Sequence, residues 1–199
     1  MLGARKQGGM SLVELMIAIA VFGILVVLGA PSFSTWLQSS QVRTAAESIV
    51  NGLQMARAEA VRRNTPVRFS LTSASGLVDW EICASNNAPC PASDLIQQRS
   101  NTEGSVNARV GVYEDGDGNN ASNYSTVVPA GNEMPTHVLF NSLGRTVNDG
   151  SGDDTVRIDV TNARNANARR MVITISIGGQ VRMCDPALTA TNPTDPKAC

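Results

Sequence analysis

The sequence has little of the chemistry that enzymes and metal centres use. Its 199 residues include one histidine, His137, and only 4% aromatic side chains. None of the four cysteines stands in a Cys-x-x-Cys pair, and no glycine-rich phosphate loop follows an expected strand. His137 follows Pro135-Thr136 at an expected strand edge, without the partners of a catalytic triad. We therefore expect no enzymatic activity, no cofactor and no bound metal.

Charge is absent from one long stretch near the start of the chain. No charged side chain occurs from Leu15 to Ala30, and Glu14 is the only one between Met10 and Ala30. As a helix, residues 10–30 would extend about 31 Å at ~1.5 Å per residue, roughly the thickness of a hydrocarbon core. A carboxylate within such a segment is costly in lipid, so Glu14 is a candidate functional residue.

The residues alone leave several interpretations of this segment open. A secretory signal peptide would explain Arg5 and Lys6, but its apolar region is shorter and Gly29-Ala30-Pro31 is a poor cleavage site. A plain membrane anchor fits the length and leaves Glu14 unexplained. Ser11 and Glu14 also have the spacing of a capping box, which would give the carboxylate a purely structural role.

The run Gly9-Met10-Ser11-Leu12-Val13-Glu14 resembles the processing site of type IV prepilins and type II secretion pseudopilins. The resemblance implies that prepilin peptidase cuts after Gly9 and that the new N-terminus, Met10, is methylated. It also implies that Glu14 acts in filament assembly and that Pro31 kinks the helix. Met10 departs from the phenylalanine usual in the family.

A filament gives the Glu14 carboxylate a physical role. When apolar helices leave the lipid and pack together, a buried carboxylate is costly unless it is paired. The positive α-amine of a neighbouring subunit is a suitable partner. Such a pair would set the axial register of each subunit.

The apolar pattern predicts a long helix followed by strands. An apolar stripe at helical spacing consists of Val42, Ala46, Ile49, Leu53, Ala56 and Ala60. We expect one helix from about Ser11 to Asn64, bent at Pro31. The period then changes to two, which predicts strands at residues 67–71, 77–83, 106–112, 138–140, 156–160 and 171–177. We expect the chain to return through residues 180–183 after a Gly178-Gly179 turn.

These elements predict the α+β class, with the long bent helix packed on an antiparallel sheet, as in the type IV pilin fold. The resemblance divides the chain into three parts. Residues 1–9 would be a cleaved leader, residues 10–35 a half-helix for the membrane and the filament core, and residues 36–199 a soluble head domain.

Export of the head would place the four cysteines in an oxidising compartment, where disulfides form. Four cysteines allow three pairings. We favour Cys83 with Cys90 and Cys184 with Cys199, because these pairs close the shortest loops. Zinc has little support, since the spacing of its ligands is missing.

Acidic and basic residues are unevenly distributed in the head. Residues 103–154 contain eight acids against two arginines, whereas residues 157–182 contain five arginines and a single acid, Asp159. The arginines could neutralise DNA phosphates, or they could form a solvated surface or a contact with a neighbouring subunit. The candidate DNA-binding residues are Arg145, Arg164, Arg169, Arg170 and Arg182.

The run Asp115-Gly-Asp117-Gly-Asn119-Asn120 has oxygen ligands at calcium-like spacing. It lacks the glycine of an EF-hand at position 120 and the glutamate at position 126. We favour a plain turn there, because such residues are also typical of turns.

Segments of the head resemble the GspH/FimT/FimU group of minor pilins and pseudopilins. The matching segments are Ala-Arg57-Ala-Glu59-Ala60, Trp80, residues 138–145 from Val138 to Arg145, and the end hairpin from Gly179 to Cys184. The resemblance implies a minor pilin of the inner membrane and of the pilus at the cell surface, with its head in the periplasm. Its partners would be prepilin peptidase, other minor pilins and the major pilin.

Within the group, two further roles stay open. A Gly-Arg-x-Arg motif is associated with DNA uptake in one branch, and here only Gly179 and Arg182 match it, because Gln180 replaces the first arginine. A pseudopilin role in type II secretion is the other alternative. The loop from Cys184 to Cys199 resembles the end region of pilins, which favours a pilus over secretion. The family resemblance implies a place at the pilus tip, where minor pilins prime assembly.

Overall fold

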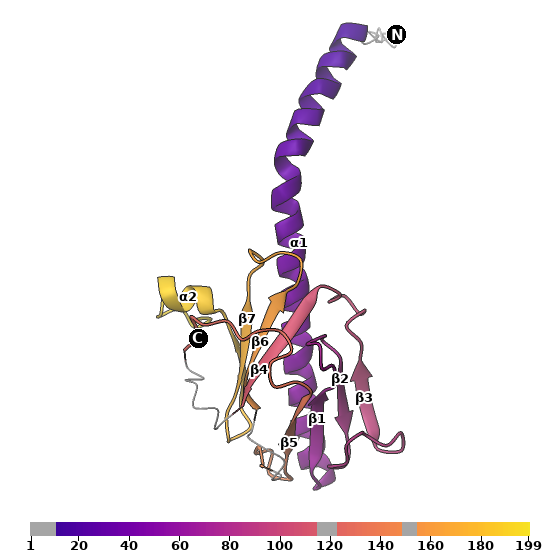
Figure 1. The fold of residues 1–199 in the computed structure, drawn as a ribbon, viewed down its shortest axis with the longest axis vertical. Coiled ribbons are helices and arrows are strands. Elements are labelled where there is room, and N and C mark those ends of the chain that lie inside the picture. Colours follow the sequence, from indigo (N-terminus) through magenta and orange to yellow (C-terminus); the bar gives the residue numbers. More distant parts are fainter. Residues whose placement is uncertain (1–10, 115–122, 149–154) are drawn as a thin grey trace, which may run out of the picture.

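A single long helix organises the molecule. The computed structural model describes residues 11–114, 123–148 and 155–199. Helix α1 comprises Leu12–Arg63 and ends at Asn64, which has a left-handed backbone with φ of 53°. Its N-terminal half projects away from the rest of the chain, and its C-terminal half lies against the strands (Figure 1).

The helix is bent where the sequence predicts it. Segments Leu12–Val27 and Ser32–Arg63 meet at 41°, so the bend spans residues 28–31, which include Pro31. Among the described residues, no single straight helix is both long enough and apolar enough to cross a membrane. The two segments meet that requirement together.

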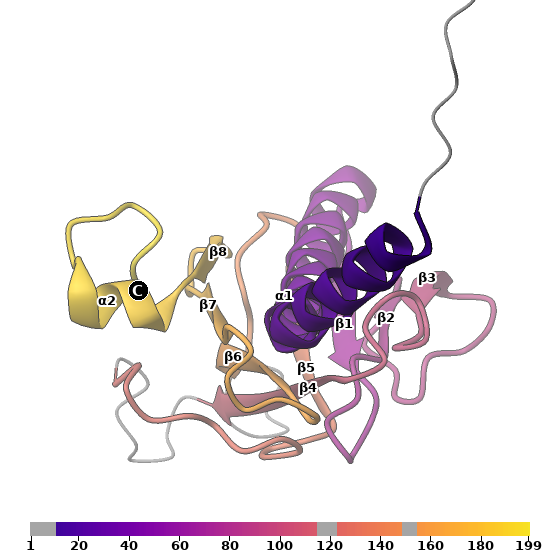
Figure 2. The same ribbon diagram turned by 90° about the horizontal axis from the view of Figure 1, so that it is seen from above.

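Two four-stranded antiparallel sheets flank the packed half of α1. The first sheet has the order β3 (Leu95–Arg99), β2 (Trp80–Cys83), β1 (Val67–Leu71) and β5 (Thr136–Phe140). The second has the order β4 (Ala108–Glu114), β6 (Thr155–Asn162), β7 (Met171–Ile175) and β8 (Val181–Cys184). Seen along the helix, the sheets lie on either side of it and α2 (Pro186–Thr191) lies far out on the second sheet's side (Figure 2).

The apolar stripe of α1 forms the centre of the core. Val42, Ile49 and Leu53 are fully buried, as are the alanines of the stripe. They pack in one cluster with strand residues such as Phe69 and Ile158. Residues 67–71 form β1 with the predicted bounds. The predicted helix and the α+β class agree with this arrangement.

Other elements differ from the sequence prediction. β2 begins at Trp80 rather than at residue 77, and β4 is shifted to Ala108–Glu114. β3 was not predicted, because its sequence Leu-Ile-Gln-Gln-Arg has no apolar alternation. α2 was also missed, although Asp185 caps it by accepting a hydrogen bond from the Ala187 N–H at 2.9 Å, and a proline follows the cap.

The β7–β8 hairpin forms, but its turn is not the predicted two-residue Gly-Gly turn. The Gly179 N–H donates to the Ser176 carbonyl at 2.7 Å, which makes Ile177 and Gly178 the central residues. Gly179 follows with φ of +74°. A left-handed residue after the turn lets the strands resume their pairing, and glycine adopts that conformation without strain.

Both disulfides join the cysteines that close the shortest loops. The Cα atoms of Cys83 and Cys90 are 5.7 Å apart. Those of Cys184 and Cys199 are 5.0 Å apart. The second disulfide ties the end of β8 to the segment that follows α2.

Candidate functional site

The first half of α1 exposes an unusual amount of apolar surface. Its large apolar side chains between Leu12 and Val27 are 50–74% exposed. The exposed surface continues to Phe33 and Trp36, whose stacked rings are 5.9 Å apart. Exposed apolar surface of this extent marks a region that lipid or other protein chains cover.

Glu14 lies in the first turn of α1 and is exposed. Ser11 begins the helix with an extended backbone, and its side chain makes no capping hydrogen bond. Of the two hydrogen bonds of a capping box, the one from the backbone N–H to the Ser11 hydroxyl is therefore not formed. Gly9 and Met10, the predicted cleavage and methylation positions, lie outside the described residues.

The strongest polar feature of the head is a buried charge network that the sequence did not reveal. Arg157 is 1% exposed and Asp159 fully buried, and Arg157 donates to the carboxylate through Nε at 2.7 Å and through Nη2 at 3.0 Å. The guanidinium of Arg170 also donates to Asp159. Such pairing is what makes a buried carboxylate tolerable. The network therefore links β6 to the residue that precedes β7 and is unavailable to a ligand.

The guanidinium groups of Arg157 and Arg170 also donate hydrogen bonds to the loop at residues 123–126, which precedes β5. Arg157 donates to the carbonyls of Asn123 at 3.0 Å and Thr126 at 2.8 Å. Its guanidinium carbon lies 5.3 Å from the centre of the Tyr113 ring and 5.1 Å from that of Tyr124. Alternation with the apolar residues of β6 would place Arg157 on the solvent side of the sheet. In the structure this loop covers the second face of the strand.

Four of the five candidate DNA-binding arginines make side-chain hydrogen bonds within the head. Arg170 is largely buried beside Asp159. Arg169 pairs with the buried carboxylate of Asp185. Arg182 donates through Nη2 to the carbonyls of Pro196 at 3.1 Å and Ala198 at 2.7 Å, which binds it to the C-terminal segment.

The five arginines also do not gather on one patch. Arg164 donates to the Asn107 amide oxygen at 3.1 Å, and the Arg169 N–H donates to the Ser39 hydroxyl at 3.1 Å, beside the middle of α1. Arg145 lies at the other end of β7, where its neighbour Thr146 donates to the Ile177 carbonyl at 3.2 Å. A five-residue strand separates these ends by about 17 Å.

The segments that carry the family resemblance meet at one place. Arg57 of α1 donates through Nε to the Gly144 carbonyl at 2.9 Å. Gly179 of the β7–β8 turn lies so close that a Cβ atom there would be 2.0 Å from the same carbonyl oxygen. Residues 57, 144 and 179 are therefore brought together from three distant parts of the sequence.

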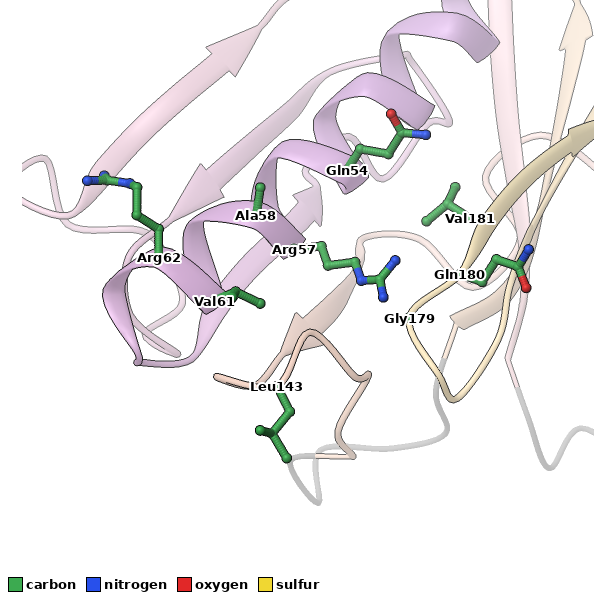
Figure 3. A pocket seen from close by; sticks show the side chains of 9 residues that line it. All are labelled: Gln54, Arg57, Ala58, Val61, Arg62, Leu143, Gly179, Gln180 and Val181. Carbon is green, nitrogen blue, oxygen red and sulfur yellow. The ribbon is translucent and has the colours of Figure 1, made fainter.

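A cavity of about 600 Å³ opens at this junction. Figure 3 shows the Arg57 side chain pointing from α1 into the space beside Gly179, with Leu143 below it and Gln180 across from it. The remaining lining residues are Gln54, Ala58, Val61, Arg62 and Val181.

Arg62 contributes little free charge to this cavity. It donates to Glu59 through Nε at 3.0 Å and through Nη2 at 2.6 Å, and Arg63 donates to the same carboxylate at 2.7 Å. Hydrogen bonds from the two arginines lower the pKa of Glu59 to about 2. Glu59 therefore stays ionised and paired, and Arg57 is the cation that faces the cavity.

The calcium-like run at residues 115–120 lies outside the described residues. In the part of the chain that the structure describes, no three histidine, cysteine or acidic side chains come together as metal ligands.

Comparison with known proteins places this geometry in a family. Residues 45–179 match the family model described as type II transport protein GspH. Residues 4–30 match the model of the prokaryotic N-terminal methylation motif. A search of curated proteins finds no match.

Solved structures give the fold. The type IV minor pilin FimU of Pseudomonas aeruginosa strain PAO1, in space group P21, matches with a TM-score of 0.52 at 14% identity. The match covers 74% of this chain and 91% of FimU. A second crystal form of FimU, in space group P65, has a TM-score of 0.46 at 15% identity and covers 73% of this chain and 94% of that one.

The GspH match covers most of the packed helix half, every strand except β8, and residues 57, 144 and 179, while the methylation motif covers the exposed helix half. The chain therefore belongs to the GspH family, and it combines the type IV minor pilin fold with an N-terminal methylation motif.

Proposed function

We propose that this protein is a minor pilin that assembles into a type IV pilus. In this proposal, prepilin peptidase removes residues 1–9 by cutting after Gly9, and Met10 becomes the methylated N-terminus. Residues 10–35 hold the subunit in the inner membrane with the head, residues 36–199, in the periplasm. The same half-helix later packs in the filament core.

The observation that carries the proposal is the exposed apolar half of α1, with its single carboxylate in the first turn. The head buries its own core without these residues, so their apolar surface is left for lipid or for neighbouring helices. Glu14 is exposed, which leaves its carboxylate accessible to a cation of another subunit.

Glu14→Ala tests this role directly. We expect the variant to insert into the membrane normally, because removing a charge favours lipid. Its amount in sheared filaments should fall at least about tenfold, since a lost buried ion pair costs more than ~1.4 kcal/mol. Quantitative immunoblots of the membrane and filament fractions measure both.

The matched control is Glu47→Ala, which removes an exposed carboxylate of the packed half that pairs with Arg43 at 2.7 Å. Its incorporation should be normal, because exposed helix pairs contribute little. Normal incorporation of Glu14→Ala would contradict the register role of Glu14.

The subunit would act at the pilus tip, where it would prime assembly together with other minor pilins and the major pilin. The contact surfaces described above support a structural, non-catalytic role of this kind. In a mutant without the chain, pilus number should fall while pilus length is kept, and electron microscopy measures both.

A pseudopilin of type II secretion is the second candidate, favoured by the description of the family model as a type II transport protein. The two functions separate in the same deletion mutant. Loss of surface pili with normal secretion supports the pilus, whereas loss of secreted protein with normal pili supports the pseudopilus.

A further inference from the structure

The cavity at the junction of residues 57, 144 and 179 has a fixed cation at its base. The Arg57 Nε–H donates to the Gly144 carbonyl at 2.9 Å, which holds the guanidinium in place. Its two Nη groups have no hydrogen-bond partner among the described residues, and no acidic side chain of that set lines the cavity. A guanidinium presented edge-on in this way suits bidentate binding of a carboxylate.

The rim of the cavity is apolar. Leu143 is 75% exposed and Val61 52% exposed, and both line the opening. Ile177, which is 67% exposed, lies in the adjoining turn, held beside the Leu143 loop by the hydrogen bond from Thr146 to its carbonyl at 3.2 Å. These side chains would bury apolar surface against a partner.

The walls add hydrogen-bonding groups. Gln54 projects from α1 above the Arg57 guanidinium, and Gln180, which directly precedes β8, lies beside it (Figure 3). Amide side chains at these places can donate to, or accept from, the backbone of a docked segment. Arginine is one of the residue types enriched at the energetic centres of protein interfaces, and the exposed Arg57 side chain is accessible to a partner.

We propose that this cavity is a docking site for an acidic segment of another pilus subunit. The segment would carry an aspartate or glutamate flanked by large apolar residues, its carboxylate on Arg57 and its apolar side chains on Leu143 and Val61. The proposal rests on the proposed function, because that function supplies the partner subunit. It places a contact at the end of the head opposite the exposed half of α1 (Figure 1).

A nucleic acid fits these features less well. A phosphate backbone binds rows of cations, whereas Arg57 is the only arginine of this cavity without an acidic partner among the described residues. Arg164 and Arg169 lie at the far end of β7. An apolar rim offers nothing to a phosphate. The charge and the rim together therefore favour a protein segment.

Peptide titration of the full chain in detergent micelles tests the site without requiring a filament. The probe is acetyl-Leu-Glu-Leu-Asp-Leu-amide, and its control replaces both acids with their amides. With ¹⁵N-labelled arginine, we expect the acidic peptide to shift the Arg57 Nε signal saturably and the amide peptide to leave it in place. Failure of Glu14→Ala to affect assembly would not alter this result, so the two proposals can fail separately.

Variants sharpen the assignment. Arg57→Lys should weaken peptide binding at least about fivefold, because an ammonium cannot form the bidentate pair. Leu143→Ser should weaken it by a similar factor through lost apolar contact, and its exposed position makes the fold insensitive to the change. Binding to the Leu143→Ser protein is followed at the Arg57 Nε signal.

Arg164→Lys is the matched control, since it changes an exposed arginine at the other end of the head. It should bind the peptide like the original chain. Equal binding of the two peptides, no shift at Arg57, or tighter binding of a short DNA duplex at the same signal would each overturn the proposal.

Discussion

The two halves of α1 have the same backbone conformation and opposite surroundings. Leu25 of the N-terminal half is 62% exposed, whereas Leu53 of the C-terminal half is fully buried. The C-terminal half has its cover in the same chain, in the two sheets. The N-terminal half is helical and apolar without any such cover, so its stabilisation must come from lipid or from neighbouring subunits.

This difference shows how one helix can serve two functions. Burial of an apolar side chain of ordinary size contributes about 2 kcal/mol of stabilising free energy, whether its own chain, another chain or lipid covers it. In the packed half that gain stabilises the head. In the projecting half the same gain becomes available only when lipid or other chains cover the apolar surface.

The largest expected effect comes from truncating one leucine in each half. Leu53→Ala should lower the free energy of unfolding of the head by about 2–5 kcal/mol, because it leaves a cavity in a packed core. Leu25→Ala should leave that free energy unchanged to within about 0.5 kcal/mol. Urea denaturation of each full-length variant in detergent, followed by tryptophan fluorescence, measures both values.

An equal loss in the two variants would mean that the projecting half contributes to the stability of the head. That result would contradict the assignment of the stability of the head to the C-terminal half of α1 alone.

A smaller effect is expected from adding one methyl group to a glycine in each half. At Gly52 a Cβ atom would lie 2.7 Å from the Phe69 ring, whereas at Gly23 no atom lies within 4 Å. Overpacking costs about 1–3 kcal/mol, which exceeds the gain of about 1 kcal/mol in helix propensity. Gly52→Ala should therefore lower the melting temperature of the head.

Gly23→Ala is the control and should leave the melting temperature unchanged or slightly raise it. Thermal unfolding by circular dichroism in detergent gives the comparison. A rise for Gly52→Ala would show that Phe69 can move aside and that the helix–sheet contact is looser than the structure implies.

The smallest effect concerns the polar face of the packed half. Hydrogen bonds from Arg62 and Arg63 lower the pKa of Glu59 from 4.5 to about 2 in the folded chain. A lowered pKa means that the carboxylate stabilises the fold above pH 4.5 and that this contribution disappears as the pH falls towards 2. Glu59→Gln should therefore be slightly less stable than the original chain at pH 6 and equally stable near pH 2.

Urea midpoints of both proteins across this pH range provide the measurement. Glu47→Gln serves as the control, because the Glu47 pair with Arg43 is more exposed. A difference for Glu59→Gln that persists at pH 2 would show that the effect is not electrostatic.

The sequence predicted the features that depend on local pattern. The stripe at residues 42–60, the β1 strand and the closely spaced cysteine pairs follow from short-range spacing. The contact of Arg57 with Gly144 could not be predicted in this way, since it joins residues 87 positions apart. The burial of Arg157 was missed because alternation identifies one covered face of a strand, and β6 has both faces covered.

Many contacts in the head join residues that are far apart in the sequence, and this affects how the protein folds during synthesis. The side chain of Asn162 donates to Gln38, 124 residues earlier, and Arg169 bonds to Ser39 over 130 residues. A fold dominated by such distant contacts forms slowly, because large loops must close before the contacts can form. The stripe of α1 is synthesised first and β8 among the last elements, so the newly made helix must remain protected from misassociation until almost the whole chain has been translated.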